Sequence, residues 1–428
     1  MTDSYPPYVG GADRQIELIA TEMAARGYTV LVATPWQPGL AELERPTERL
    51  TVHRIKGLTT RVSWFFRDPS RRSQPPFPDP ATTLALRRII GRIRPDVVHS
   101  YGWISYSAAL AVTGMGVPLL LSVRDHGHIC AVRYLMQYGA TDCSGPALAK
   151  CLGCAAATYV ADEALGSSSP LTLTQRLRGI SKGIVAVASI RLAAPLLRAQ
   201  TRWLHVASRH VATTTQRWLF RGSSAVPVSV IPSFLAEDPT TDADLAALER
   251  LPAEDFVLFV GRLVPQKGIA QLLEAWQDLS PRPTLVLIGP RTHQTPASFP
   301  DGVVVLPPMS HAGILGAWDR AMFGVMPSLG GETFGSVAVE AMSRGRAMVA
   351  SSTGGLRDII RDGDDGILVP PGDVEALRGA MQRLLDDPAL RDRLGTEARM
   401  AARRFAAEAV LPGFEALYLR AAGREERA

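Results

Sequence analysis

The sequence predicts an α/β protein built from two doubly wound domains, and three observations support this. Short apolar runs typical of buried strands alternate with helix-like segments along most of the chain. A length of 428 residues suits two domains that each bury a core of their own. The charge is also divided, since residues 1–232 hold 26 Lys and Arg against 14 Asp and Glu, a net +12, whereas residues 233–428 hold 20 against 27, a net −7.

The predicted strands are short and apolar, as expected for parallel sheets covered by helices on both faces. In the first half they begin near residues 29 (TVLVATP), 95 (PDVVHS) and 118 (PLLLSV); in the second half near 256 (FVLFVG), 284 (TLVLIG), 303 (VVVLP), 321 (AMFGVMPS) and 347 (AMVASS). The uncharged stretch 101–123 is long enough to span a membrane. Several glycines and Pro118 interrupt it, so we expect a short helix followed by a strand.

The first residues, MTDSYPPYVGG, are typical of a loop that leaves a first strand, yet almost no strand precedes them. In a doubly wound sheet that strand is central, and its omission leaves backbone groups unpaired. We therefore expect either that further residues precede Met1 or that a shortened strand suffices.

The domain boundary is predicted in the acidic, proline-bearing stretch between the two halves. We expect an N-terminal domain at 1–232 with a Cys-rich insertion at about 125–160, a linker at 233–253, a C-terminal domain at 254–405, and a terminal helix and tail at 406–428. The apolar spacing of that last helix requires burial against one of the domains. Within the linker, Asp242 and Asp244 are expected at a helix start and not as a metal-binding pair.

The basic first half favours anionic partners such as lipid headgroups or phosphorylated carriers. Trp64, Phe65 and Phe66 lie among arginines in a Pro- and Ser-rich segment, which suits a membrane interface or, alternatively, a loop folded over the core or an acceptor lid. No legible leader peptide is present, so we expect a cytoplasmic protein, peripheral on the inner membrane face. We expect no nucleic acid partner, since no motif for reading it occurs.

The motif PSLGGETFGSVAVEAMSRG is the strongest chemical signal. It places Glu332 and Glu340 on either side of a glycine-containing loop that should turn into a helix. Glycines let a ligand approach the backbone, and the free N–H groups at a helix start attract a phosphate. A second signal, FVGRLVPQKG, puts Arg262 and Lys267 directly after a predicted strand, where α/β proteins bind ligands and two cations can neutralise a diphosphate.

Together these motifs make the chain resemble the retaining glycosyltransferases of family four, which have the GT-B fold of two Rossmann-like domains facing a cleft. The resemblance also includes SYPPYVGGADRQ, PDVVHSYG, VIPSF and STGGLRDIIRDGDDGILVPPGD, and so covers nearly the whole chain. It implies that the terminal helix crosses back to the N-terminal domain. It also implies that the second domain holds a nucleotide sugar and the first an acceptor.

The resemblance further assigns roles to particular residues. It implies that Arg262 and Lys267 hold the donor diphosphate, that Glu332 binds donor-sugar hydroxyls, and that Glu340 binds the ribose. Backbone groups of four residues would bind the phosphates and the sugar: Phe334, Gly335, Ser336 and Val337. Two glycines of the first loop, Gly10 and Gly11, would approach the donor phosphate from the other domain. The reaction it implies retains the anomeric configuration and requires no metal cofactor.

One departure from the family pattern concerns SVRDHGHIC. The family commonly has a His-Asp pair after this strand, but here Arg124 precedes Asp125. We predict Asp125 as a catalytic residue, with His126 or His128 as alternatives for the contact to the donor sugar, and a purely structural loop aspartate as a further alternative.

All four cysteines fall within one short segment: Cys130, Cys143, Cys151 and Cys154. The final CxxC pair suits a tetrahedral zinc, and a metal would order the long loop between the cysteines. We predict a structural zinc, with an iron–sulfur cluster or free or redox-active thiols as alternatives.

The sequence thus predicts a glycosyltransferase that moves a sugar from a nucleotide-diphosphate donor to a hydroxyl acceptor, such as a lipid-linked, anionic glycan of the cell envelope. The alternatives are a hydrolysing epimerase of nucleotide sugars and a non-catalytic module that binds nucleotide sugars or carriers. The absence of GxGxxG after a strand and of GxxxxGK counts against a dehydrogenase and a nucleotide triphosphatase.

Overall fold

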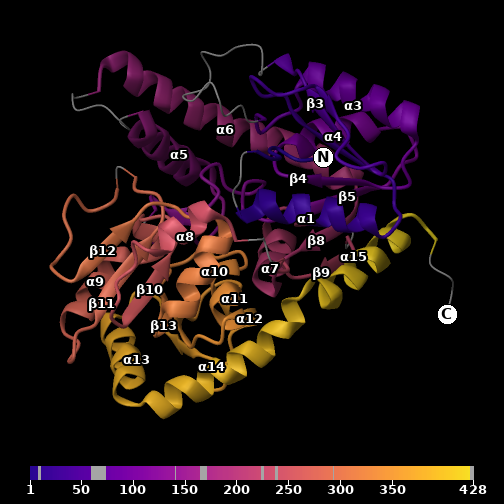
Figure 1. Cartoon of the computed structure of the whole chain (residues 1–428). Helices are drawn as coiled ribbons and strands as arrows, with labels where there is room; N and C mark the ends of the chain where they lie inside the picture. Colours follow the sequence, from indigo (N-terminus) through magenta and orange to yellow (C-terminus); the bar gives the residue numbers. More distant parts are fainter. Residues whose placement is uncertain are drawn as a thin grey trace.

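The computed structural model describes residues 1–7, 11–58, 74–139, 141–163, 171–222, 226–236, 240–292 and 294–424. Figure 1 shows two lobes joined side by side, with the last helix returning from the second lobe to the first. The predicted phosphate contact at Gly10 and the aromatic residues Trp64, Phe65 and Phe66 lie outside the described residues.

In the described part of the N-terminal domain, two sheets form the core, besides a small two-stranded sheet near the junction with the second domain. One has the order β1 (Val30–Pro35), β3 (Leu50–Ile55), β2 (Leu43–Glu44), and the other is the parallel set β4 (Val98–Tyr101), β5 (Leu119–Val123), β8 (Thr201–Val206), β9 (Val228–Val230). The first residues of the chain lie between them, because Thr2 N donates to Ala33 O (3.0 Å) and Tyr101 N donates to Met1 O (2.9 Å). Through these backbone hydrogen bonds, the first residues take the place of the expected central first strand.

Helices cover these sheets. They are α1 (Gly11–Ala25), α3 (Pro80–Ile93), α4 (Ile104–Val112), α6 (Leu173–Gln200) and α7 (Arg209–Trp218). The charge-free stretch 101–123 forms the short helix α4 and the buried strand β5, as predicted.

The described part of the C-terminal domain contains one six-stranded sheet in which every neighbouring pair is parallel. Its order is β12 (Val303–Leu306), β11 (Thr284–Ile288), β10 (Phe256–Val260), β13 (Phe323–Met326), β14 (Met348–Ser351), β15 (Ile367–Val369). Along β10, Leu258 belongs to one hydrophobic cluster and Val257 and Phe259 to another. Alternate side chains point to opposite faces of a strand, so the sheet is buried on both sides, as predicted.

The helices of this domain precede, separate and follow its strands along the chain. They are α8 (Asp242–Leu248), α9 (Ile269–Gln277), α10 (His311–Arg320), α11 (Ser336–Ser343), α12 (Leu356–Ile359), α13 (Val374–Asp386) and α14 (Pro388–Ala402). Asp244 forms a reciprocal capping box with Thr241 at the start of α8, so the expected helix-start role of this segment is confirmed.

The last helix, α15 (Ala407–Ala421), packs on the N-terminal domain (Figure 1). Its apolar face includes Phe414 and Leu417, which are buried in a cluster with Ile19 and Leu120 of the first domain. The Tyr418 hydroxyl lies 2.8 Å from His99 Nδ1 of β4. The predicted crossing helix is therefore confirmed, and it connects the two domains.

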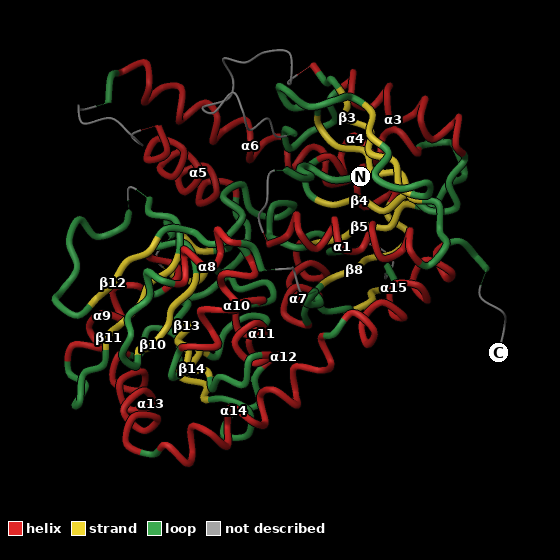
Figure 2. Tube along the Cα trace, viewed as in Figure 1, coloured by secondary structure: helices red, strands yellow, loops and turns green. Residues whose placement is uncertain are grey.

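Two helices of the N-terminal domain form a separate pair. α5 (Leu148–Glu163) runs against the first half of α6, and Figure 2 shows these two segments at one side of the domain, away from its strands. Among the described residues, α6 is the single helix that is long and apolar enough to cross a membrane by length and composition. No pattern noted in the sequence predicted this apolar helix.

Candidate active site

Two neighbouring strands of the C-terminal sheet bring the predicted cationic and acidic motifs together. Arg262 follows β10, and the loop bearing Glu332 follows β13, which pairs with β10 in parallel. Carboxyl ends of parallel strands meet at one edge of a sheet, which is where α/β proteins bind ligands. Backbone contact joins the two loops, since Leu329 N donates to Gln266 O (3.0 Å).

An ion pair lies at this edge. Lys267 Nζ binds Glu332 Oε1, and the Ser328 hydroxyl donates to the same carboxylate oxygen at 2.8 Å. Glu332 is 8 % exposed. A buried carboxylate requires a partner of opposite charge, and Lys267 supplies it. The structure thus brings together one member of each predicted motif.

Two glycines make this arrangement possible. Gly268 has φ 73°, and a Cβ at this position would lie 2.0 Å from Pro327 O, so a side chain there would separate the Lys267 segment from the Glu332 loop. Gly335 has φ 110° and is the N-cap of α11, which begins at Ser336. The predicted change from loop to helix at this point is confirmed.

The start of α11 is anchored by an aromatic contact. The ring of Phe334 is buried and lies 5.8 Å from that of Phe405, in an edge-to-face arrangement. This contact holds Phe334 in place just before the helix. The backbone of Ser336 and Val337 then forms the first turn of α11, where the helix dipole favours binding of an anion.

Glu340 lies further along α11 at the junction with the first domain. Burial raises its pKa to about 7, and the positive charge of Arg14 on α1 opposes this rise. His311 Nδ1 lies 3.6 Å from its Oε1. Arg14 also donates to Ala236 O at 3.1 Å. Sequence reasoning missed Arg14, although it stands within the quoted GGADRQ motif, three residues after Gly11, the first residue of α1.

The N-terminal domain reaches over the same edge through residues 134–139 and 141–142, which contain the short strands β6 (Met136–Gln137) and β7 (Thr141–Asp142). We call this segment the β6–β7 hairpin. The Arg262 guanidinium carbon lies 5.5 Å from the centroid of the Tyr134 ring. A Cβ on Gly331 would lie 2.6 Å from Tyr134 O, so the hairpin backbone contacts the Glu332 loop closely. No sequence signal pointed to Tyr134.

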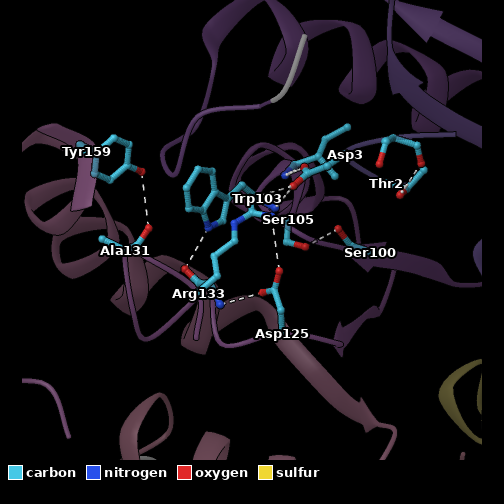
Figure 3. Close-up of polar contacts among 12 residues, drawn as sticks. Thr2, Asp3, Ser100, Trp103, Ser105, Asp125, Ala131, Arg133 and Tyr159 are labelled. Carbon is cyan, nitrogen blue, oxygen red and sulfur yellow. Dashed lines mark hydrogen bonds and ion pairs between the residues drawn. The ribbon is translucent and has the colours of Figure 1, made fainter. Parts of the chain in front are cut away.

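Asp125 follows β5 in the N-terminal domain (Figure 3). Its Oδ1 accepts from Gly127 N at 2.7 Å, and its Oδ2 pairs with Arg133 at 3.3 Å. Arg133 also stacks over the Trp103 ring at 4.0 Å and lies 3.7 Å from Asp3. The carboxylate is thus held in a polar network, while 43 % of its side chain stays exposed.

The two histidines after Asp125 are buried. Burial lowers the pKa of both His126 and His128 to about 4, so both rings are neutral near pH 7. Neither ring nitrogen of His126 has a hydrogen-bond partner among the described residues, and its ring lies 5.8 Å from that of His210. His126 therefore has unused hydrogen-bonding capacity.

Three cysteines contact the start of the β6–β7 hairpin. Cys154 Sγ accepts from Tyr138 N at 3.2 Å, Cys143 N donates to Leu135 O at 2.9 Å, and the backbone N–H of Leu135 favours the thiolate of Cys130. Burial is the larger influence on Cys130 and raises its pKa. The fourth, Cys151, lies one helical turn before Cys154 on α5. No disulfide joins the four.

The part of the chain that the structure describes contains no group of three or more His, Cys, Asp or Glu side chains placed to hold a metal ion. The arrangement of the cysteines therefore does not by itself form a zinc site. The zinc expectation stays a prediction.

The two domains match two families of glycosyltransferase sequences. The model described as Glycosyltransferase Family 4 matches residues 9–145, and the model described as Glycosyl transferases group 1 matches residues 242–401.

Curated relatives show the same likeness. The chain is 35 % identical over 210 residues to a phosphatidyl-myo-inositol mannosyltransferase of Mycobacterium leprae, which covers 46 % of this chain and 54 % of the relative. It is 33 % identical over 186 residues to a D-inositol 3-phosphate glycosyltransferase of Jonesia denitrificans, covering 40 % and 44 %. An exopolysaccharide phosphotransferase of Streptomyces coelicolor is 30 % identical over 225 residues, covering 50 % and 23 %. The similarity thus spans about half or less of each relative's length.

Solved structures agree over almost the whole chain. A sucrose-phosphate synthase from Thermosynechococcus elongatus has a TM-score of 0.68 at 21 % identity and covers 97 % of this chain and 95 % of its own. The HepE protein of Anabaena, in complex with UDP and glucose, has a TM-score of 0.61 at 17 % identity and covers 97 % and 98 %. The fold is therefore GT-B, the two-domain architecture of glycosyltransferases. Within that class the chain belongs to glycosyltransferase family 4, as the sequence motifs indicated.

Proposed function

We propose that this chain transfers a glycosyl group from a nucleotide-diphosphate sugar to a hydroxyl of an acceptor, with retention of the anomeric configuration. The observation that supports this best is the Lys267–Glu332 pair beside Arg262 at the start of α11. The structural neighbour HepE has been solved with UDP and with UDP-glucose, which suits a nucleotide-sugar donor.

In this proposal the donor diphosphate lies between Arg262, Lys267 and the first turn of α11. These positive groups stabilise the charge that develops on the diphosphate as the glycosidic bond breaks. Binding of the diphosphate by Lys267 frees the Glu332 carboxylate to accept hydrogen bonds from the hydroxyls of the sugar. Glu340 accepts hydrogen bonds from the ribose.

The acceptor hydroxyl attacks the anomeric carbon on the face from which the diphosphate leaves. The C–O bond to the acceptor forms, the bond to the diphosphate breaks, and a diphosphate oxygen takes the hydroxyl proton. Asp125, at the end of β5, faces the acceptor side and orients this hydroxyl. No step assigns a role to a metal, so we expect transfer to persist in a chelator.

We further propose that the acceptor is lipid-linked and anionic, and that the protein works at the cytoplasmic face of a membrane. The net charge of +12 over residues 1–232 supports this, because a basic surface concentrates anionic partners.

The test is to screen nucleotide sugars by thermal shift and then to measure nucleotide release with and without acceptor. A donor at 100 times its Kd adds about 2.7 kcal/mol of apparent stability. We expect release to depend on the acceptor and Glu332→Gln to lower turnover by about 100-fold or more. Glu397→Gln, at an exposed position of α14, is the matched control. Release without acceptor would identify an epimerase, and donor binding without release a binding module.

A further inference from the structure

Helix α6 has two apolar faces, and the described residues cover one of them. The covered face contains Gly179, Gly183, Ile190 and Leu197, all buried. A Cβ on Gly179 would lie 2.7 Å from Val160 Cα of α5, so the two helices pack with their backbones in close approach. This face already has its partner within the N-terminal domain.

The second face is an apolar stripe open to solvent. Leu173, Leu177, Ile180 and Ile184 are 73 %, 56 %, 38 % and 46 % exposed. Their spacing of four, three and four residues places them on one side of the helix, and we call them the α6 stripe. Leu192, 81 % exposed, lies further along the same helix. Large apolar side chains grouped in this way mark an interaction site.

The charge of α6 indicates what covers the stripe. The helix contains five Arg and Lys residues and no Asp or Glu. Two of the five, Arg178 and Lys182, reach Glu163 of α5 at 3.6 and 2.5 Å, whereas Arg176 and Arg191 are exposed. Leucine and isoleucine on one side with flanking cations complement an anionic lipid surface, in which the acyl region takes the apolar groups and the phosphates take the cations.

The position of α6 in the fold favours lying on a membrane over crossing it. Its most apolar 18-residue window has a mean hydropathy of 1.6, and one third of that window is buried inside the protein. Crossing a bilayer would require α6 to leave α5, whose backbone it contacts at Gly179 and Gly183. A helix that keeps one face on the protein can present the other to the interface.

We propose that the α6 stripe docks the N-terminal domain on an anionic bilayer. Leu173, Leu177, Ile180 and Ile184 enter the boundary between headgroups and acyl chains, and Arg176 and Arg191 contact lipid phosphates. The surface is distinct from the donor site. The inference builds on the proposed function only in that a lipid-linked acceptor would then lie in the same membrane.

Vesicle co-sedimentation of the full chain tests this. We expect binding to vesicles of phosphatidylcholine with phosphatidylglycerol, weaker binding to phosphatidylcholine alone, and a decrease with salt. The double variant Leu177→Ser/Ile180→Ser should bind at least about tenfold more weakly. The control is Leu84→Ser/Leu245→Ser, which changes two exposed leucines of α3 and α8.

A second variant tests the proposal even if Leu177→Ser/Ile180→Ser does not fold. Ile180→Trp should show a blue shift of tryptophan emission when anionic vesicles are added, as its side chain leaves water. The proposal is overturned if the Leu177/Ile180 variant binds vesicles as well as the wild type does. It is also overturned if the wild type does not bind vesicles and light scattering instead shows a wild-type dimer that the Leu177/Ile180 substitutions dissociate. Vesicle binding without glycosyl transfer would refute only the proposed function.

Discussion

The guanidinium carbon of Arg262 lies 5.5 Å from the centre of the Tyr134 ring, although the two residues belong to different domains. Arg262 follows the central strand of the C-terminal sheet, and Tyr134 is the first residue of the β6–β7 hairpin of the N-terminal domain. Gly331, next to Glu332, contacts the Tyr134 backbone as well. The candidate donor site is thus completed by a segment from the opposite domain, and the orientation of Arg262 depends on how the domains meet.

Replacing Tyr134 should therefore weaken donor binding. A cation over an aromatic ring contributes about 0.5–2 kcal/mol, so Tyr134→Leu should raise the donor KM by about 3- to 30-fold with little change in kcat. Tyr134→Phe keeps the ring and should behave like the wild type. Steady-state kinetics with varied donor concentration measures both. Equal losses in the two variants would show that the hydroxyl matters and the ring does not.

Donor binding should strengthen as the pH rises through about 7. Burial raises the pKa of Glu340 to about 7, against the positive charge of Arg14 and with His311 nearby, and only the ionised carboxylate accepts two hydrogen bonds from a ribose. Calorimetric titration of the donor between pH 5.5 and 8.5, roughly a range centred on this pKa, measures the effect. Glu340→Gln should remove it. A wild-type profile that is flat over this range would rule out the ribose role.

The same carboxyl should make folding stability depend on pH in the opposite sense. The native pKa of about 7 exceeds the ordinary value of 4.5, so the native state retains the proton longer, and the free energy of unfolding falls as the pH rises from about 4.5 to 7. The loss is on the order of 3 kcal/mol. Urea unfolding should show a steeper fall of the unfolding free energy with pH in the wild type than in Glu340→Gln, because other buried groups such as Asp3 contribute equally to both proteins. A parallel slope in both proteins would contradict the assignment to Glu340.

Asp125→Asn separates a catalytic from a structural role for this residue. Asparagine keeps an oxygen that accepts from Gly127 N, so the turn should persist and the Tm should change little. We expect kcat to fall by about 100-fold, since an amide does not orient the acceptor hydroxyl as a carboxylate does. A lowered Tm with an unchanged kcat would instead assign Asp125 to the network of Arg133 and Trp103.

Metal analysis of the purified chain tests the prediction for the cysteines. We expect one zinc ion per chain, bound by Cys130, Cys143, Cys151 and Cys154, and its loss in Cys151→Ser/Cys154→Ser. Because three of the cysteines contact the β6–β7 hairpin, this variant should also raise the donor KM through Tyr134. Iron with visible absorption would point to a cluster, and a metal-free chain that titrates four thiols would point to free cysteines.

Several elements could be predicted because their signals are local. The strand 256–260, the loop-to-helix change at Gly335 and the burial of the last helix follow from apolar spacing and from glycine. Strand β8 was missed, because Arg202 and His205 interrupt its apolar run. The two apolar faces of helix α6 were not predicted, because only the packing of α6 on α5 shows which face is buried and which is exposed.

The sequence alone determined the two doubly wound domains and the family. It also placed four residues at the ends of strands and at the start of a helix: Arg262, Lys267, Glu332 and Glu340. These features could be predicted because each depends on the pattern of residues close by in the chain. Only the tertiary structure decided that Lys267 pairs with Glu332, that Tyr134 stacks on Arg262 and that Arg14 faces Glu340. These contacts join residues far apart in the chain. They arise where strand order and the closure of one domain on the other bring distant loops together, and no local pattern encodes that geometry.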